Sequence, residues 1–232
     1  MAISTVLPKK PPKIRYPESD GKPMAENTKQ FRWIVTVKEG LEAVFAADPN
    51  VFIAGDLLWY PVEGHPEIRV APDALVVFGR PKGDRGSYLQ WDEADVAPQV
   101  VFEILSPGNT IAEMTRKIRF YERYGVEEYY LYDPDKGELS GWQRRGELLE
   151  EIEKMTGWVS PRLGIRFEIE DLELALYRPD GERFLTYLEL VEAREEAEQR
   201  ADRAEHRADR AEARVHRLAE QLRALGVEPE SS

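Results

Sequence analysis

A carboxylate in the middle of an apolar strand is the first candidate for chemistry in this sequence. Glu103 lies within the run Val100–Leu105, whose other side chains are all apolar. An ionised carboxylate in such surroundings costs several kcal/mol unless it is paired or binds a cation. Glu103 therefore needs a partner, which is either an Arg or Lys in a structural ion pair or a metal ion.

A second carboxylate precedes another apolar run. Asp73 follows Pro72 and opens Ala74–Phe78, so we expect it at or near the beginning of a strand. A Pro-Asp dipeptide considered alone is usually just a turn. Asp73 therefore gains interest only in combination with Glu103 and with the helix that follows Glu103.

That helix, predicted over residues 111–124, carries a candidate cationic partner. Glu113, Lys117 and Tyr121 are spaced by four residues and so share one face. A Glu–Lys pair at this spacing is commonly a surface stabiliser worth a few tenths of a kcal/mol. The opposite stripe of the helix is apolar, however, which leaves Lys117 free to lean back over the strand end.

The surrounding pattern predicts an α/β domain that would position these residues. Apolar spacing and turn residues indicate, in order, a helix over residues 31–45, strands over 51–60 and 68–78, a long surface loop over 79–97, a strand over 99–105, a helix over 111–124, a strand over 127–132, a hairpin over 139–144 and 148–152, and a closing segment over 165–177. Strand, helix and strand around Glu103 form a βαβ-like unit. This part of the sheet should therefore be parallel and covered on both faces.

The two ends of the chain differ in composition from this domain. Residues 1–26 are rich in Pro, Lys and Ser and predict a flexible arm, whereas residues 27–185 hold the domain. A heptad seam predicts a coiled-coil helix over residues 187–226, before a disordered tail over 227–232. The seam consists of Ala197, Ala201, Ala204, Ala208, Ala211, Val215, Leu218, Leu222 and Leu225. We expect a homo-oligomer, in the simplest case a dimer, and the alternative is a single solvated helix with i,i+4 charge pairs.

Three ordered motifs resemble a known family. They are Pro-Asp-Ala-Leu-Val-Val from Pro72, Phe-Glu-Ile-Leu-Ser-Pro from Phe102, and Lys-x3-Tyr-x3-Gly-Val-x-Glu-Tyr-Tyr from Lys117. Together they resemble the Uma-two family of restriction-endonuclease-like proteins, a branch of the PD-(D/E)XK nuclease superfamily, over roughly residues 27–175. The resemblance implies a mixed sheet flanked by helices and a metal-dependent endonuclease that hydrolyses phosphodiester bonds, with DNA as the expected substrate.

The resemblance also implies roles for individual residues. Asp73 and Glu103 would bind Mg²⁺ or Mn²⁺, with Glu42 on the first helix as a further acidic ligand. The superfamily usually places a Lys two residues after the Glu, where this chain has Leu105. Lys117 is therefore expected to stabilise the phosphorane charge and to orient the attacking water. Apart from the resemblance, the basic residues Arg80, Lys82 and Arg85 of the glycine-rich loop are expected to contact a phosphate backbone, and Tyr121 is expected as a further contact.

Other kinds of site receive little support. The sequence has no cysteine, and its three histidines lie in a turn (His65) and in the coil (His206 and His216), so no thiolate site, histidine triad or zinc cluster is indicated. Gly79–Gly86 is glycine-rich but lacks the ending of a P-loop. Asp56 has apolar neighbours and is a competing buried acid, which we interpret as structural.

Charge and hydropathy limit the class of protein further. The formal net charge of −12 argues against a protein that coats nucleic acid, because such binding depends on Lys and Arg. No apolar stretch suits a membrane span or a signal peptide, so we expect a cytoplasmic protein. Two alternatives to the nuclease stay open: an inactive nuclease-fold module for binding or assembly, motivated by Leu105 and the acidic surface, and a structural protein whose coil is the working part.

Overall fold

The computed structural model describes residues 14–19, 21 and 23–224 of this 232-residue chain. It divides into two compact units, one that ends at Phe184 and one that begins at Leu185. The predicted tail over residues 227–232, the last seam residue Leu225 and the first half of the predicted N-terminal arm lie outside the described residues.

A mixed sheet of six strands forms the centre of the first unit, in the order β1-β3-β5-β6-β7-β8. Strands β5 and β6 run parallel and the other neighbouring pairs are antiparallel. This confirms the predicted α/β class and the parallel unit around Glu103. The strands are β1 (Val51–Ala54), β3 (Ala74–Phe78), β5 (Val100–Ile104), β6 (Glu128–Asp133), β7 (Glu138–Arg145) and β8 (Leu148–Glu151).

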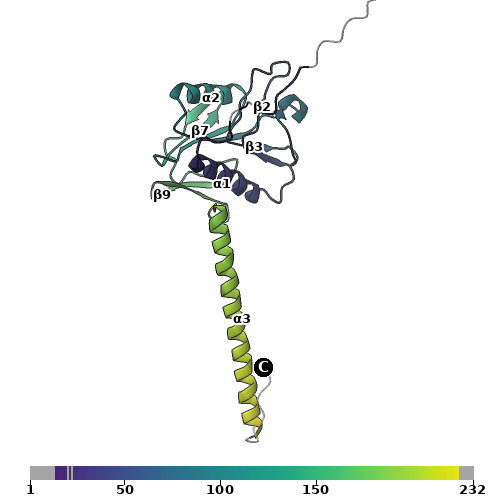
Figure 1. The fold of residues 1–232 in the computed structure, drawn as a ribbon, viewed down its shortest axis with the longest axis vertical. Helices are drawn as coiled ribbons and strands as arrows, with labels where there is room; N and C mark the ends of the chain where they lie inside the picture. Colours follow the sequence, from purple (N-terminus) through teal and green to yellow (C-terminus); the bar gives the residue numbers. More distant parts are fainter. Residues whose placement is uncertain (1–13, 20, 22, 225–232) are drawn as a thin grey trace, which may run out of the picture. The chain divides into compact units, whose positions relative to one another are not determined.

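Helices cover both faces of this sheet, as Figure 1 shows for α1 (Thr28–Val44) and α2 (Ile111–Arg123). Helix α1 begins at an Asn27 cap whose side chain accepts a hydrogen bond from the Gln30 amide. Helix α2 begins in the same way at Thr110, which accepts from the Glu113 amide. Because side chains alternate along a strand, each sheet face supplies its own core cluster, and the cluster beneath α1 is the larger.

The alternation along β3 and β5 directs the candidate site residues to the α2 face. Val100, Phe102 and Ile104 of β5 belong to the core beneath α1, whereas Val101 belongs to the core beneath α2. Glu103 has the same parity as Val101 and therefore projects toward α2. By the same rule Asp73, two residues before Leu75 of the α2 core, lies on that face as well.

Two predicted strands are shorter in the structure. The strand predicted over residues 51–60 divides into β1 and a separate β2 (Trp59–Tyr60), because Asp56 between them has a left-handed φ of 48° that interrupts the extended chain. The strand predicted over residues 68–78 begins only at Ala74. Pro72 has no amide hydrogen to donate to a strand ladder, so the regular strand starts after it. Its earlier part contributes an isolated bridge between Val70 and Trp59.

The segment predicted as a long loop contains short regular pieces. Strand β4 (Tyr88–Leu89) pairs with β2, and a 3₁₀ helix follows over Gln90–Glu93. The Tyr88 side chain is fully buried and its hydroxyl donates to the Val96 carbonyl at 2.7 Å. This internal anchor explains why a segment without apolar periodicity is ordered.

The remaining strands of the first unit close the α1 side. Strands β9 (Arg166–Glu170) and β10 (Glu173–Tyr177) form an antiparallel pair whose Phe167 and Leu174 enter the core beneath α1. Phe184 also enters this core, and its ring lies so close to Gly40 of α1 that a Cβ atom there would meet it at 2.1 Å. Glycine is therefore required at position 40 for the close approach.

The described part of the N-terminal arm has no helix or strand before Thr28, but it contacts the domain. The Tyr16 ring packs on Tyr60 and Trp91, and the Pro17 carbonyl accepts a hydrogen bond from the Tyr60 hydroxyl. Glu26 accepts one from the Ser106 hydroxyl at 2.6 Å. These contacts hold the end of the arm beside the loop that follows β5.

The second unit contains one long helix among its described residues, α3 (Tyr187–Ala224), none of whose side chains is buried. It begins at Tyr187, where the predicted helix begins, and the last two residues of the predicted helix lie outside the described part of the chain. Among the described residues, no helix is both long and apolar enough to cross a lipid bilayer.

Candidate active site

The start of β3 and the end of β5 bring the two predicted carboxylates together. Ala74 is paired with Phe102 in the antiparallel register, so Asp73 and Glu103 come level one step further along. The Oδ2 atom of Asp73 accepts a hydrogen bond of 2.6 Å from the backbone amide of Ile104. A backbone contact thus fixes the first carboxylate beside the strand that carries the second.

Helix α2 supplies two partners to Glu103. The Nζ atom of Lys117 lies 2.6 Å from Oε2, and the Tyr121 hydroxyl donates to Oε1. Glu103 is 2% exposed and Tyr121 is fully buried. The spacing of four residues between Lys117 and Tyr121 is what allows both to reach one carboxylate from consecutive turns of the helix.

The electrostatics of this cluster are unbalanced. Burial raises the pKa of Asp73 well above its usual range, and the charge of Glu103 raises it further. The charge of Lys117 and the hydrogen bond from the Ile104 amide lower the pKa of Asp73, but by less than burial and Glu103 raise it. The cluster therefore holds more negative than positive charge when both carboxylates are ionised.

The two α2 residues respond to the same charges. Burial acts to lower the pKa of Lys117, but the charges of Glu103 and Asp73 outweigh it and hold that pKa above the ordinary value. Burial raises the pKa of the Tyr121 hydroxyl well above its usual range, and the Glu103 carboxylate raises it further. Lys117 is therefore a cation and Tyr121 a neutral donor at neutral pH.

A divalent ion fits the chemistry of this donor set. Mg²⁺ commonly binds proteins through one or two carboxylates and completes its shell with water and substrate phosphate. Asp73 and Glu103 provide those carboxylates, and a bound cation would oppose the effects of burial and of the Glu103 charge that raise the pKa of Asp73. Across the described residues, no three acidic or histidine side chains are grouped closely enough to hold an ion by themselves.

Glu42, expected as a further ligand, is not brought into this cluster. Its Oε2 atom accepts from Lys82 at 2.9 Å, and Lys38 lies 3.9 Å from its other oxygen. These residues line a separate, polar hollow with Gly55 and Arg85. Its role as a further ligand stays a prediction, since helical position alone does not say which sheet edge a long side chain reaches.

The predicted substrate-binding residues of the loop are engaged within the chain. Arg80 and Arg85 both pair with Glu93, at 2.8 and 2.6 Å, and Arg85 also lies over the Phe52 ring. Lys82 is the partner of Glu42. In this structure the three cations therefore stabilise the loop fold.

Tyr121 was expected from the sequence to contact the nucleic acid. Because its side chain is fully buried and its hydroxyl bonds Glu103, it is placed to orient that carboxylate and not to touch a substrate. Asp56, interpreted from the sequence as buried, is partly exposed. Its charge adds a smaller upward contribution to the pKa of Asp73.

One buried polar contact was missed from the sequence. The Gln30 amide donates to the Ile104 carbonyl at 2.9 Å, and Gln30 is 6% exposed. Gln30 continues the apolar stripe of α1 formed by Ile34, Val37 and Leu41, all of which belong to the core. A polar residue on such a stripe was the available signal, because a buried amide requires a partner.

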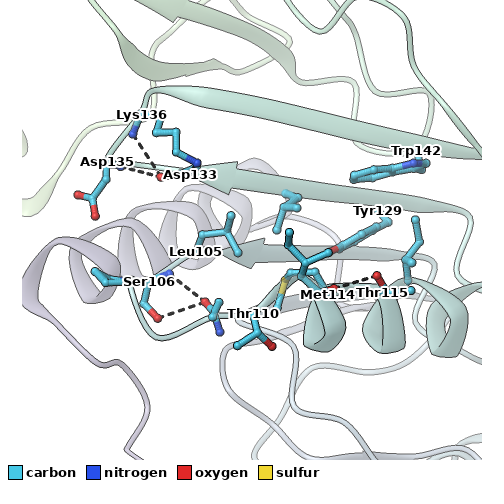
Figure 2. Close-up of a pocket in the computed structure, with 15 residues that line it drawn as sticks. Leu105, Ser106, Thr110, Met114, Thr115, Tyr129, Asp133, Asp135, Lys136 and Trp142 are labelled. Carbon is cyan, nitrogen blue, oxygen red and sulfur yellow. Dashed lines mark hydrogen bonds and ion pairs between the residues drawn. The ribbon is translucent and has the colours of Figure 1, made fainter.

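A largely apolar groove of about 560 Å³ opens on the same sheet face, along the side of α2 that carries Met114 and Ile118 (Figure 2). Leu131, which is paired with Glu103 in the β5–β6 register, lies in its floor. Tyr129 and Trp142 are stacked there, with ring centroids 5.0 Å apart. The groove and the carboxylates are thus neighbours on one face, contacted by different sides of the same helix.

The fold and site define an α/β domain of nuclease type, with an acidic pair and a lysine at the junction of β3, β5 and α2. A family model described as "Putative restriction endonuclease" (Uma2) matches residues 7–181, and the chain belongs to this family. This confirms the resemblance indicated by the motifs and extends it toward the N-terminus, into the arm that contacts the domain.

Solved structures similar to this chain include one described as a putative nuclease belonging to DUF820 from Anabaena variabilis. It is 18% identical in sequence, with a TM-score of 0.48, and the match covers 65% of this chain and 83% of that one. No curated protein matches the chain.

Proposed function

We propose that this protein is a Mg²⁺- or Mn²⁺-dependent endonuclease that hydrolyses phosphodiester bonds in DNA. The observation that carries the proposal is the convergence of Asp73, Glu103 and Lys117 from β3, β5 and α2 on one point, with excess negative charge. Membership of a family described as restriction endonucleases supports the same conclusion.

Each residue has a distinct role in the proposal. Asp73 and Glu103 would hold the ion, which supplies an activated water and polarises the phosphate when bound. Lys117 carries a positive charge beside the carboxylates, where negative charge develops on the phosphate in the transition state. Tyr121 fixes the Glu103 rotamer through its hydroxyl and so acts as a positioning residue.

The proposal includes the organisation expected from the sequence. The nuclease-like domain over residues 27–185 acts in the cytoplasm and is joined to a coiled-coil helix that makes the protein a homodimer. Arg80, Lys82 and Arg85 would reach a phosphate backbone only by leaving their present acidic partners. They are therefore secondary to the carboxylate site in this proposal.

A cleavage assay tests the proposal directly. Full-length protein is incubated with supercoiled plasmid, single-stranded DNA and RNA, each with Mg²⁺, Mn²⁺ or chelator. Asp73→Asn and Glu103→Gln should each reduce cleavage by about 100-fold or more. Glu150→Gln is the matched control, because Glu150 is an exposed carboxylate whose partner Arg145 lies 3.5 Å away. Absence of metal-dependent cleavage by the wild-type protein on every substrate would overturn the proposal.

A second candidate function is a nuclease-fold module that binds or assembles without turnover. The specific observation in its favour is that both Glu103 oxygens already have partners, Lys117 and Tyr121, while Leu105 stands where the superfamily usually has Lys. Calorimetric titration separates the two functions. Mn²⁺ binding that disappears in Glu103→Gln supports the nuclease, and absence of Glu103-dependent binding supports the module.

A further inference from the structure

Helix α3 presents an apolar seam that nothing in the described structure covers. No side chain of α3 is buried, and the larger seam residues Val215, Leu218 and Leu222 are 66, 49 and 38% exposed. Helices in proteins owe most of their stability to packing of an apolar face. A 38-residue helix with such a seam therefore calls for a partner.

The spacing of the seam fixes the heptad positions along α3. Steps of four and three residues place Ala201, Ala208, Val215 and Leu222 at position a, and Ala197, Ala204, Ala211 and Leu218 at position d. The two flanks of the seam are then positions e and g. These flanks are the surfaces that face each other across a two-stranded coil.

The charges on the two flanks are completely separated by sign. Position e holds Glu198, Glu205 and Glu212 in successive heptads, and position g holds Arg200, Arg207 and Arg214. Within the chain, Arg200 and Arg207 donate to carbonyls of their own helix, and Glu198 pairs with Arg194 at 2.8 Å. All of these contacts are at the exposed surface, where they contribute little.

This separation distinguishes the two orientations of a dimer. In a parallel pair, position g of one helix faces position e of the next heptad in its partner, so Arg200 meets Glu205 and Arg207 meets Glu212 of the second copy. In an antiparallel pair, e faces e and g faces g. Glu would then oppose Glu and Arg would oppose Arg, which is repulsive in the three heptads that carry these charges.

We infer that α3 binds a second copy of this chain as a parallel, in-register two-stranded coiled coil. Alanine at a and d lets the helices approach closely but provides little apolar burial, so the flanking charges set orientation and partner. Because the first unit ends at Phe184 and α3 begins at Tyr187, chain connectivity then attaches both N-terminal units at the same end of the coil. The inference does not depend on nuclease activity.

Disulfide crosslinking tests the orientation, because the full-length chain has no cysteine of its own. Ala197→Cys and Leu222→Cys place single thiols near the two ends of the seam. In a parallel, in-register dimer both variants should form disulfide-linked dimers on mild oxidation. Ala213→Cys is the matched control, because position 213 is f and faces away from the partner. Crosslinking of neither seam variant, or of Ala213→Cys equally well, would overturn the inference.

Charge reversal provides the second test, with mass measured by light scattering. The wild-type chain should be a dimer. Glu205→Arg with Glu212→Arg, and separately Arg200→Glu with Arg207→Glu, should each raise the dimer dissociation constant by about tenfold or more. An equimolar mixture of the two double variants should dimerise again, because opposite charges then face each other. A monomeric wild type, or double variants that dimerise as tightly as wild type, would contradict the inference.

Discussion

The Nζ atom of Lys117 lies 2.6 Å from Oε2 of Glu103, although the two residues are 14 positions apart and belong to different elements. Both side chains are largely removed from water, with 19 and 3% of their surface exposed. The sequence left two partners open for Lys117: Glu113 on the helix surface, or the strand end that carries Glu103. In the structure Lys117 is the neutralising charge of the buried Glu103 carboxylate.

Removal of Lys117 should affect both stability and activity. Lys117→Ala leaves Glu103 buried without its cation, and such a loss costs about 3 kcal/mol of unfolding free energy. Urea denaturation should show this loss in the wild-type background but a much smaller one in Glu103→Gln. Equal losses in both backgrounds would mean that the two residues are not coupled. If the chain is a nuclease, cleavage should also fall by about 100- to 1000-fold.

Tyr121→Phe tests the positioning role of the hydroxyl. The variant keeps the buried ring but removes the donor to Glu103, which should lower stability by about 1.5 kcal/mol or more, because a hydrogen bond to a charged group is lost. Metal affinity should fall by about 10- to 100-fold. Tyr124→Phe is the matched control at the C-cap of the same helix, because the Tyr124 ring packs on Phe120 and its hydroxyl has no bond to Glu103. An equal effect of both substitutions would contradict the role.

Asp73→Asn should stabilise the folded domain in a pH-dependent manner. The pKa of Asp73 is raised on folding, so the folded state keeps a proton that the unfolded chain releases above about pH 4. Stability is thus lost as the pH rises from that value through the raised pKa. Asn removes this loss, and its advantage in urea denaturation should grow from pH 5 to pH 8. A gain that is the same at both pH values would contradict this explanation.

Divalent metal should reverse the order of stability, so that wild type gains more than Asp73→Asn. A cation bound beside Asp73 favours the ionised carboxylate, so Mg²⁺ or Mn²⁺ should raise the melting temperature of wild type, and more strongly at pH 8 than at pH 5. Asp73→Asn should show little of this effect. A metal-induced shift of equal size in both proteins would place the ion elsewhere.

Gly40→Ala should destabilise the first unit without touching the carboxylates. The added Cβ would lie 2.1 Å from the Phe184 ring, and overpacking of this kind typically costs about 1 to 3 kcal/mol. In a Phe184→Ala background the same substitution should cost far less, because the ring is gone. Similar losses in both backgrounds would show that the close approach is unimportant.

A parallel dimer has a consequence for plasmid cleavage if the chain is a nuclease. Two active domains at one end of a coil would cut both strands in one encounter, so wild type should yield linear product early. The charge-reversed double variants should mainly nick, and their mixture should restore linear product. If the wild-type protein is shown to dimerise but produces only nicked plasmid, the two sites do not act together.

Local sequence pattern was sufficient for much of the fold. The apolar run around Glu103, the capped helix after it and the glycine at its end indicated a strand–helix–strand unit, which the structure contains as β5, α2 and β6. Three motifs in order also identified the family. Such features are encoded by neighbouring residues, because periodicity and capping act over a few positions.

Contacts between distant residues were not accessible in this way. The Asp73 carboxylate accepts a hydrogen bond from the Ile104 amide, 31 residues away in the sequence. The Gln30 side chain donates to the Ile104 carbonyl, 74 residues away. Glu42 shows the converse, because its helix was predicted correctly while its partner, Lys82 in the loop, was not. Strand register and the reach of long side chains decide such pairs, and neither is written in local periodicity.

The sequence by itself determined which residues are candidates for chemistry, since a carboxylate in an apolar strand requires a partner, and it determined the heptad seam of α3, since helical spacing is local. The tertiary structure alone decided that Lys117 and Tyr121 share Glu103, that Tyr121 is enclosed, and that the Glu42 carboxylate pairs with Lys82. The physical reason is that burial and charge balance depend on how elements pack together, and only the folded chain brings those charges within reach of one another.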